Sequence, residues 1–249
     1  MIRRLRIAGT SLGGAIALCC VLTPVAAAQA SVPAIPGLTS KGEPVSWTIL
    51  LLLTVLTVLP AIVLSMTPFV RILVVFHFLR QALGTQTTPT NQTLIGLALF
   101  LTYFLMAPVG NAIQQTAIVP LEHGRISAWE AIDRSSVPMK AFMLKYAREK
   151  DLALFVELSD TPRPKTPDDL PMRVVAPAYL ISELKTGFQI GAVLFLPFLV
   201  IDIVTASVTT SIGMFQLPPV VISTPLKILL FVSVDGWNLV IGSLMKSFH

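Results

Sequence analysis

Residues 187–248 carry the strongest structural signal in the chain, and they read GFQIGAVLFLPFLVIDIVTASVTTSIGMFQLPPVVISTPLKILLFVSVDGWNLVIGSLMKSF. Two long apolar runs flank a short turn at 213–219, where a glycine and two adjacent prolines interrupt helix formation. Each run approaches the roughly 20 residues that a helix needs to cross the hydrocarbon core of a bilayer. The sequence therefore predicts that residues 178–249 form a hydrophobic helical hairpin.

Both runs of this hairpin carry charges: Asp202 lies in the first, and Lys227 and Asp235 lie in the second. A charge at mid-bilayer depth costs at least about 2.5–3.5 kcal/mol, so these side chains are expected to face protein, a partner or water. Asp202 and Lys227 are equidistant from the turn, as are Glu183 and Lys246, and each pair is predicted to neutralise across the hairpin. The alternative is that these charges act separately against other subunits. In either case the hairpin is expected to need neighbours.

The composition places the chain among membrane proteins, because 54% of its 249 residues are hydrophobic, only 12% are charged, and the mean hydropathy is +0.78. Residues 111–173 hold nine acidic and nine basic side chains, so the net charge of +5 arises elsewhere. The basic excess is spread between the first residues and the flanks of the apolar runs. This distribution forms no basic patch and argues against nucleic acid as a partner.

Residues 1–30 are typical of a secretory signal peptide, with arginines near the start and an apolar stretch at 7–22. The small residues before Ser31 predict cleavage between Ala30 and Ser31; an uncleaved N-terminal anchor is the alternative. The following segment, 31–46, is rich in Pro, Gly and Ser and is predicted to be a flexible lead.

No catalytic or metal-binding motif is found in the sequence. Both cysteines, Cys19 and Cys20, lie in the predicted leader, so the mature chain is expected to have no disulfide and no thiolate chemistry. The three histidines are scattered, and the sequence contains no HExxH, GxSxG, GxGxxG or phosphate-binding loop. We therefore expect no enzyme activity, no cofactor and no metal site.

Residues 47–110 predict a second hydrophobic helical hairpin. An uncharged run at 47–66 continues into a stretch with Arg71 and Arg80 embedded, and another apolar run follows at 93–109. The polar turn between them carries positive charge and no acid, which places it on the cytoplasmic side. The pattern Gly187-x-x-x-Gly191 further along the chain predicts close contact between helices.

Residues 111–177 predict a small polar helical domain, which the same topology places on the periplasmic side. Ser127 fits the start of a helix with a capping box, and Ser136 before a proline predicts a second helix start. Phe142 and Phe155 are the bulkiest apolar groups in this charged region. Either they form a local core, or they contact a neighbouring subunit.

Four motifs in this order resemble the FliP family of flagellar biosynthesis proteins. The motifs are RQALGTQ at 80–86 followed by Pro89, Asn91 and Gln92, SELKTGFQIG at 182–191, LPP at 217–219 and VDGWNL at 234–239. The resemblance extends over residues 47–248. Members of this family are core subunits of the flagellar type III export gate, and close relatives serve in virulence injectisomes.

The resemblance implies an all-α chain of kinked hydrophobic helices that assembles as a helical, conical ring of five copies. FliQ, FliR and other membrane proteins of the export apparatus are the implied partners. The implied function is a pore for unfolded flagellar proteins at the inner membrane and flagellar basal body. Much of this assembly would lie above the membrane plane, which agrees with the charges embedded in the apolar runs.

The resemblance also implies roles for individual residues. In the family the hairpin turn carries a methionine cluster that closes the pore like a gasket, and this cluster corresponds to Met214, Phe215 and Gln216. Only Met214 keeps the methionine, whose flexible apolar side chain suits a seal around a passing chain. Phe215 would seal by bulk, whereas Gln216 adds a polar group, so a stiffer seal is expected.

Subunit contacts in the family involve the positions of Phe142, Phe155 and Glu183. The chain departs from the family pattern at Pro68 and His77, and the sequence gives neither residue a role. The competing hypothesis is a proton-coupled transporter or ion channel that uses His77 with the embedded charges as a relay. The sequence shows no inverted repeat, and about four hydrophobic runs are few for a transporter that acts alone.

Overall fold

The computed structural model describes residues 47–85, 87–159, 166–214 and 216–248. The chain divides into two units, Met1–Val55 and Leu56–His249, and most of the described residues belong to the second. Within the described ranges the secondary structure is helical and contains no strand, which confirms the all-α prediction. The predicted leader at 1–30, its cleavage site at Ala30 and Ser31, the lead at 31–46, and Phe215 lie outside these ranges.

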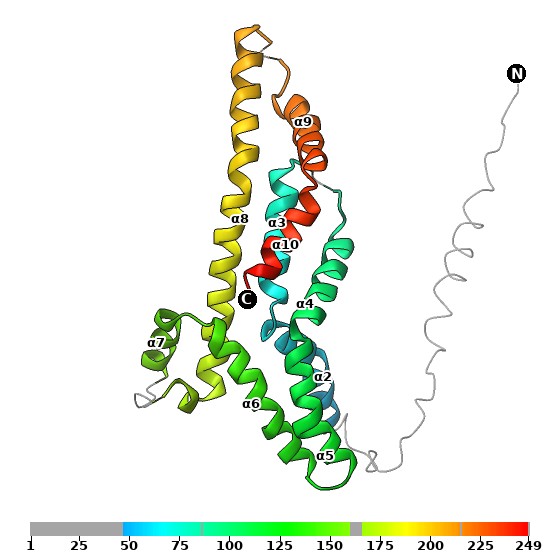
Figure 1. The fold of residues 1–249 in the computed structure, drawn as a ribbon, viewed down its shortest axis with the longest axis vertical. Coiled ribbons are helices and arrows are strands. Elements are labelled where there is room, and N and C mark those ends of the chain that lie inside the picture. The colour runs from blue at the N-terminus through cyan, green and yellow to red at the C-terminus, as the bar shows by residue number, and fades with distance from the viewer. Residues whose placement is uncertain (1–46, 86, 160–165, 215, 249) are drawn as a thin grey trace, which may run out of the picture. The chain divides into compact units, whose positions relative to one another are not determined.

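The helices follow one another along the chain with short connections (Figure 1). They are α2 (Trp47–Ser65), α3 (Phe69–Ala82), α4 (Asn91–Ile113), the π-helix η1 (Gln114–Ile118), α5 (Val119–Glu122), α6 (Ala128–Tyr146), α7 (Glu149–Leu158), the 3₁₀ turn η2 (Pro167–Asp169), α8 (Met172–Ser211), α9 (Val220–Ser233) and α10 (Gly236–Lys246). The 40-residue helix α8 crosses position 177, where the sequence places the end of the polar domain.

Two of the helices are long and apolar enough to cross a membrane, Asn91–Glu122 and Met172–Ser211. Two bent pairs also pass this test if each is counted as one span. Ile49–Ser65 meets Phe69–Ala82 at 74°, and Val220–Ser233 meets Gly236–Lys246 at 67°. The first bend precedes Pro68, whose fixed φ and missing N–H interrupt the helical hydrogen bonds. The membrane character indicated by the composition therefore has a structural basis in two long apolar helices and, if each bent pair is counted as one span, in up to four.

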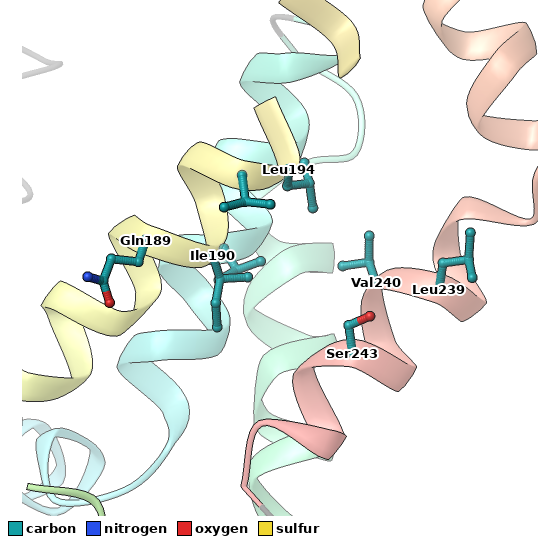
Figure 2. A pocket seen from close by; sticks show the side chains of 8 residues that line it. Gln189, Ile190, Leu194, Leu239, Val240 and Ser243 are labelled. Atoms are coloured by element: carbon teal, nitrogen blue, oxygen red, sulfur yellow. The ribbon is translucent and has the colours of Figure 1, made fainter. Parts of the chain in front are cut away.

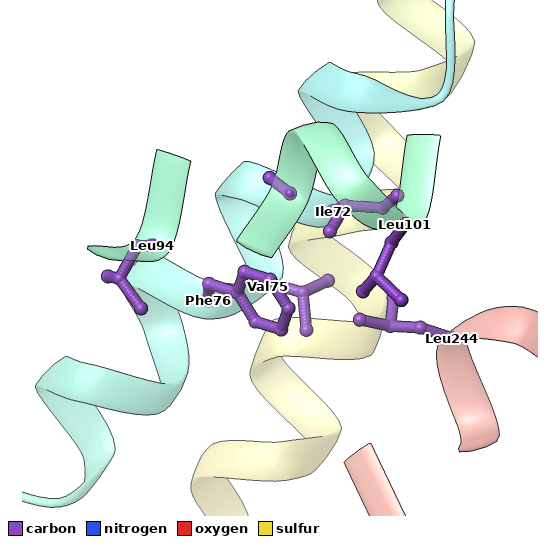
Figure 3. Close-up of a cluster of buried hydrophobic side chains, with 7 residues drawn as sticks. Ile72, Val75, Phe76, Leu94, Leu101 and Leu244 are labelled. Atoms are coloured by element: carbon purple, nitrogen blue, oxygen red, sulfur yellow. The ribbon is translucent and has the colours of Figure 1, made fainter. Parts of the chain in front are cut away.

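Helix α3 lies at the centre of the second unit. Its residues Ile72, Val75 and Phe76 are fully buried in a cluster with α4 and α10 (Figure 3). The partners labelled there are Leu94 and Leu101 from α4 and Leu244 from α10. A second buried cluster lies further along α3 and joins it to α8 and α9; it comprises Leu79, Ala82, Leu83, Phe198 and Phe231. Burial of such side chains contributes about 1.5–3 kcal/mol each.

The contact between α3 and α8 is close because α8 presents glycines to it. A Cβ atom added at Gly191 would lie 2.5 Å from the ring of Phe78, and one added at Gly187 would lie 3.1 Å from Val74. The helix contact predicted from the Gly187-x-x-x-Gly191 pattern is thus confirmed.

The helix start predicted at Ser127 is confirmed, whereas no helix boundary falls at residue 111, which lies inside the helical segment Asn91–Glu122. Ser127 caps α6 by accepting a hydrogen bond from the Glu130 amide, 3.3 Å away. The helix start predicted at Ser136 is wrong, because α6 continues through Pro138 to Tyr146. A proline removes only one helical hydrogen bond, and the preceding turns of α6 already fix the backbone. The break falls at Ala147–Arg148, both in extended conformation.

Candidate functional site

Among the described residues, the most deeply buried ion pair joins α3 to α8. Arg71 and Glu183 are 3% and 0% exposed. The Arg71 Nε donates to Glu183 Oε2 at 2.8 Å, and Nη2 donates to Oε1. A two-point pair of this kind satisfies both carboxylate oxygens, which a buried charge requires. The acid that pairs with Arg71, Glu183, therefore lies 112 positions further along the chain.

The remaining Arg71 nitrogen holds the segment that follows α10. Nη1 donates to the carbonyl and the hydroxyl of Ser247, at 3.3 and 3.2 Å. The Phe248 ring lies 3.8 Å from the guanidinium carbon, and the Tyr146 hydroxyl donates to the Phe248 carbonyl. Sequence reasoning missed Ser247, Phe248 and Tyr146. Arg71 itself was the available signal, because an arginine in an apolar run without a nearby acid needs distant partners.

The predicted pairing of Glu183 with Lys246 is wrong, because both Glu183 oxygens accept hydrogen bonds from Arg71. Two residues equidistant from the turn lie at equal depth only if the second arm of the hairpin is one straight helix. This arm instead breaks at Asp235 and bends by 67°. Beyond that residue, the number of residues from the turn therefore no longer measures depth along the hairpin.

The pairing predicted nearer the turn is confirmed. Lys227 Nζ donates to Asp202 Oδ2 at 2.6 Å, which joins α9 to α8. The lysine side chain is 5% exposed and that of Asp202 is 33% exposed. The buried hydroxyls of Thr205 and Thr209 donate hydrogen bonds to carbonyl oxygens one turn earlier in α8. The hairpin thus neutralises its central charges internally.

The hairpin turn is exposed where the structure describes it. Gly213 has φ +79°, a left-handed conformation that glycine adopts without steric cost, and its amide closes α8 onto Thr210. Met214 is 39% exposed, and Gln216 and Leu217 beside it are exposed as well. The described part of the predicted gasket therefore lies on the surface of the single chain.

Phe142 and Phe155 are half-buried and belong to the cluster around Met143 and Tyr179. The Phe142 ring lies 5.0 Å from the ring of Tyr146 and 6.2 Å from that of Tyr179. Both phenylalanines thus contribute to a local core in the single chain. Their remaining exposed surface is available to a neighbour, so the two roles considered from sequence are compatible.

Pro68 and His77 occupy ordinary structural positions. Pro68 is buried and precedes α3 at its bend with α2. The His77 Nδ1 lies 2.8 Å from the Leu73 carbonyl in the preceding turn of α3. In the described part of the chain, the hydrogen bonds of His77 and those of the Asp202–Lys227 pair remain separate. The relay of the transporter hypothesis is not assembled there.

Large apolar side chains cover much of the outer surface of the C-terminal hairpin. Val193, Ile203 and Val232, for example, are 68%, 58% and 70% exposed. An apolar hollow of about 430 Å³ lies between α8 and α10 (Figure 2). It is lined by Val75, Gln189, Ile190, Val193, Leu194, Leu239, Val240 and Ser243. Apolar surfaces of this extent mark contacts with lipid or protein.

Comparison with known proteins identifies the family. A model of the FliP family matches residues 52–244. The chain belongs to the FliP family. A flagellar biosynthetic protein FliP of Pectobacterium carotovorum is 50% identical over 222 residues, which cover 86% of each chain. The FliP of Bacillus subtilis is 53% identical over 211 residues, covering 84% of this chain and 96% of the relative. The FliP of Caulobacter vibrioides is 52% identical over 80% of this chain and 74% of its own length.

Family membership together with the apolar helices makes this chain a membrane component of flagellar biosynthesis. Its FliP relatives are named for flagellar biosynthesis, and these names state no catalytic activity. The matched region contains both ion pairs, the hairpin turn and the Asp235 break. Apart from Ser247 and Phe248, which contact Arg71, the sites described above therefore lie in the matched region.

Proposed function

We propose that this chain is a pore-forming core subunit of the flagellar type III export gate. One observation carries this proposal: the C-terminal hairpin neutralises its central charges internally while aliphatic side chains cover its exterior and Met214 stands at its exposed tip. Such a hairpin is suited to packing against copies of itself. Its tip would then reach the axis of the assembly.

The proposed mechanism is geometric and involves no catalysis. A ring of copies, five by family resemblance, surrounds a channel with FliQ and FliR as partners. The turns at 213–217 constrict this channel, and unfolded flagellar proteins pass through it. Met214 supplies a flexible apolar contact that adapts to a passing chain and relaxes afterwards.

Phe142, Phe155 and Glu183 belong to the proposed subunit interface in different ways. The two rings keep exposed surface and can contact a neighbour directly. Glu183 is buried, so its contribution is indirect: it fixes α3 against α8 through Arg71. We further propose that residues 111–177 face the periplasm and that the chain resides in the inner membrane at the flagellar basal body.

A leakage measurement tests the constriction. Replacement of Met214 and Phe215 by glycine removes the apolar groups at the tip, so cells expressing this variant with FliQ and FliR should admit small solutes. Met106→Ser, which changes a half-buried methionine on α4, is the control and should leave the membrane tight. Unchanged permeability of the glycine variant, with assembly intact, would contradict a seal at this turn.

A further inference from the structure

Arg80 in α3 and Asp235 between α9 and α10 are charges outside the ion pairs described above. Within the described residues, neither Arg80 nor Asp235 forms an ion pair. Asp235 is the third acid of the C-terminal hairpin region; Glu183 and Asp202 already have partners. An unpaired charge buried in an apolar interface is costly, so each of these two would need an opposite charge wherever assembly buries it.

Arg80 lies in a polar hollow at the C-terminal end of α3. The hollow has a volume of about 440 Å³ and is lined by His77, Arg80, Gln81, Gly84 and Thr85. Arg80 Nη1 donates to Asn91 Oδ1 at 2.5 Å. This amide oxygen is neutral, so it orients the guanidinium without compensating its charge. The hollow therefore presents an oriented cation with room beside it for a carboxylate.

Asp235 lies on the exposed link between α9 and α10. Its φ is +50°, the left-handed conformation that costs a residue with a Cβ about 1–2 kcal/mol. Its carboxylate does not cap α10, although the residue occupies the N-cap position. Strained residues of this kind concentrate at functional positions. The backbone thus exposes an acid that the described chain itself does not use.

Arg80 and Asp235 lie at the same height, measured along the axis of α3. Phe231, four residues before Asp235, belongs to the buried cluster with Leu79 and Ala82. Trp237, two residues after it, packs on Phe76 with ring centroids 6.4 Å apart. Asp235 is therefore level with the segment 76–82, which contains Arg80.

The other unpaired cations of the C-terminal hairpin lie at a different height. Lys185 lies two residues after Glu183, and Lys246 lies directly before Ser247. Because Glu183 and Ser247 both bind Arg71, the two lysines lie at the height of Arg71. Arg71 precedes Arg80 by nine residues, which corresponds to about 13 Å along a helix. In the described apolar helices, Arg80 alone is an unpaired cation at the height of Asp235.

We propose that Asp235 of one copy enters the Arg80 hollow of the next copy and forms an intersubunit ion pair. This inference rests on the ring proposed above. If neighbouring copies are offset along the assembly axis by less than the spacing between Arg71 and Arg80, residues of similar height meet, and a head-to-tail contact joins two different faces of the same chain. Phe76 and Leu79 of α3 pack towards α9 and α10, whereas His77, Arg80 and Gln81 line the hollow.

Charge reversal tests this pair in the full-length chain purified in detergent. Arg80→Glu and Asp235→Arg should each lower the ring fraction in native mass measurements by about tenfold or more, because each places like charges in one interface. The double variant should restore the ring. Lys185→Glu reverses an exposed cation at another height, so it should leave the ring intact and fail to rescue Asp235→Arg.

A disulfide test does not depend on the stability of the reversed charges. In a background with Cys19 and Cys20 replaced by alanine, the double variant Arg80→Cys with Asp235→Cys should give a ladder of linked chains on oxidation. A mixture of the two single variants carrying different tags should give heterodimers only.

The outcomes separate this inference from the proposed function. Intact rings in both charge reversals, or rings without any cross-linked ladder, would overturn the ion pair and leave the pore proposal standing. A wild-type chain that forms no ring, alone or with FliQ and FliR, would overturn both.

Discussion

At the scale of single residues, burial determines what each charge contributes. The Arg71–Glu183 pair is almost inaccessible to solvent, whereas the Glu130–Arg134 pair on α6 has side chains 47% and 45% exposed. Removing one partner of a buried pair leaves a charge that neither water nor protein compensates. Exposed pairs contribute little because water screens them.

We therefore predict that Glu183→Ala lowers the free energy of unfolding by about 3–5 kcal/mol. Glu130→Ala, the matched control, should change it by less than about 1 kcal/mol. Thermal unfolding of the detergent-solubilised chain, followed by circular dichroism, measures both. Equal effects of the two substitutions would show that the Arg71–Glu183 contact does not persist in solution.

The Asp202–Lys227 pair should respond asymmetrically to mutation. Lys227 is 5% exposed and Asp202 is 33% exposed, so removing the acid leaves a buried ammonium, whereas removing the lysine leaves a carboxylate that water reaches. Asp202→Asn should therefore destabilise the chain more than Lys227→Met does, measured by the same thermal unfolding. A larger loss for Lys227→Met would contradict the observed difference in burial.

At the scale of helices, the sequence shows turns and contacts more reliably than it shows bends. Gly213 and the Pro218–Pro219 pair indicate the hairpin turn, and equal spacing from it predicts the Asp202–Lys227 pair, which the structure confirms. The bend at Asp235 coincides with the Asp235-Gly236 dipeptide, a turn signal that the prediction of one straight second arm overlooked. Conversely, Pro138 suggests a helix boundary, yet α6 continues through it.

The α3–α8 contact gives a prediction at this scale. Gly191→Ala places a methyl group 2.5 Å from the Phe78 ring, so the helices must shift, and stability should fall by about 1–3 kcal/mol. Gly96→Ala on α4 is the control: no atom lies within 4 Å of its added Cβ, and the helix should gain up to about 1 kcal/mol. Opposite shifts of the melting temperature are expected, and a gain at Gly191 would refute the close contact.

At the scale of the whole molecule, the chain leaves a large apolar surface uncovered. Its core is organised around α3, its central charges are paired, and yet long helices such as α8 and α9 leave aliphatic side chains exposed. Composition predicts the membrane class and family resemblance predicts the assembly. The identity of the Arg71 partners could not be predicted, because residues 112 and 176 positions apart meet only through folding.

The most direct test is the native mass of the detergent-extracted chain, measured alone and after co-expression with FliQ and FliR. We expect a discrete multimer of several copies that becomes larger when the partners are present. A stable monomer that remains monomeric with both partners would contradict the export-gate function, and it would favour a transporter or channel that acts as a single chain.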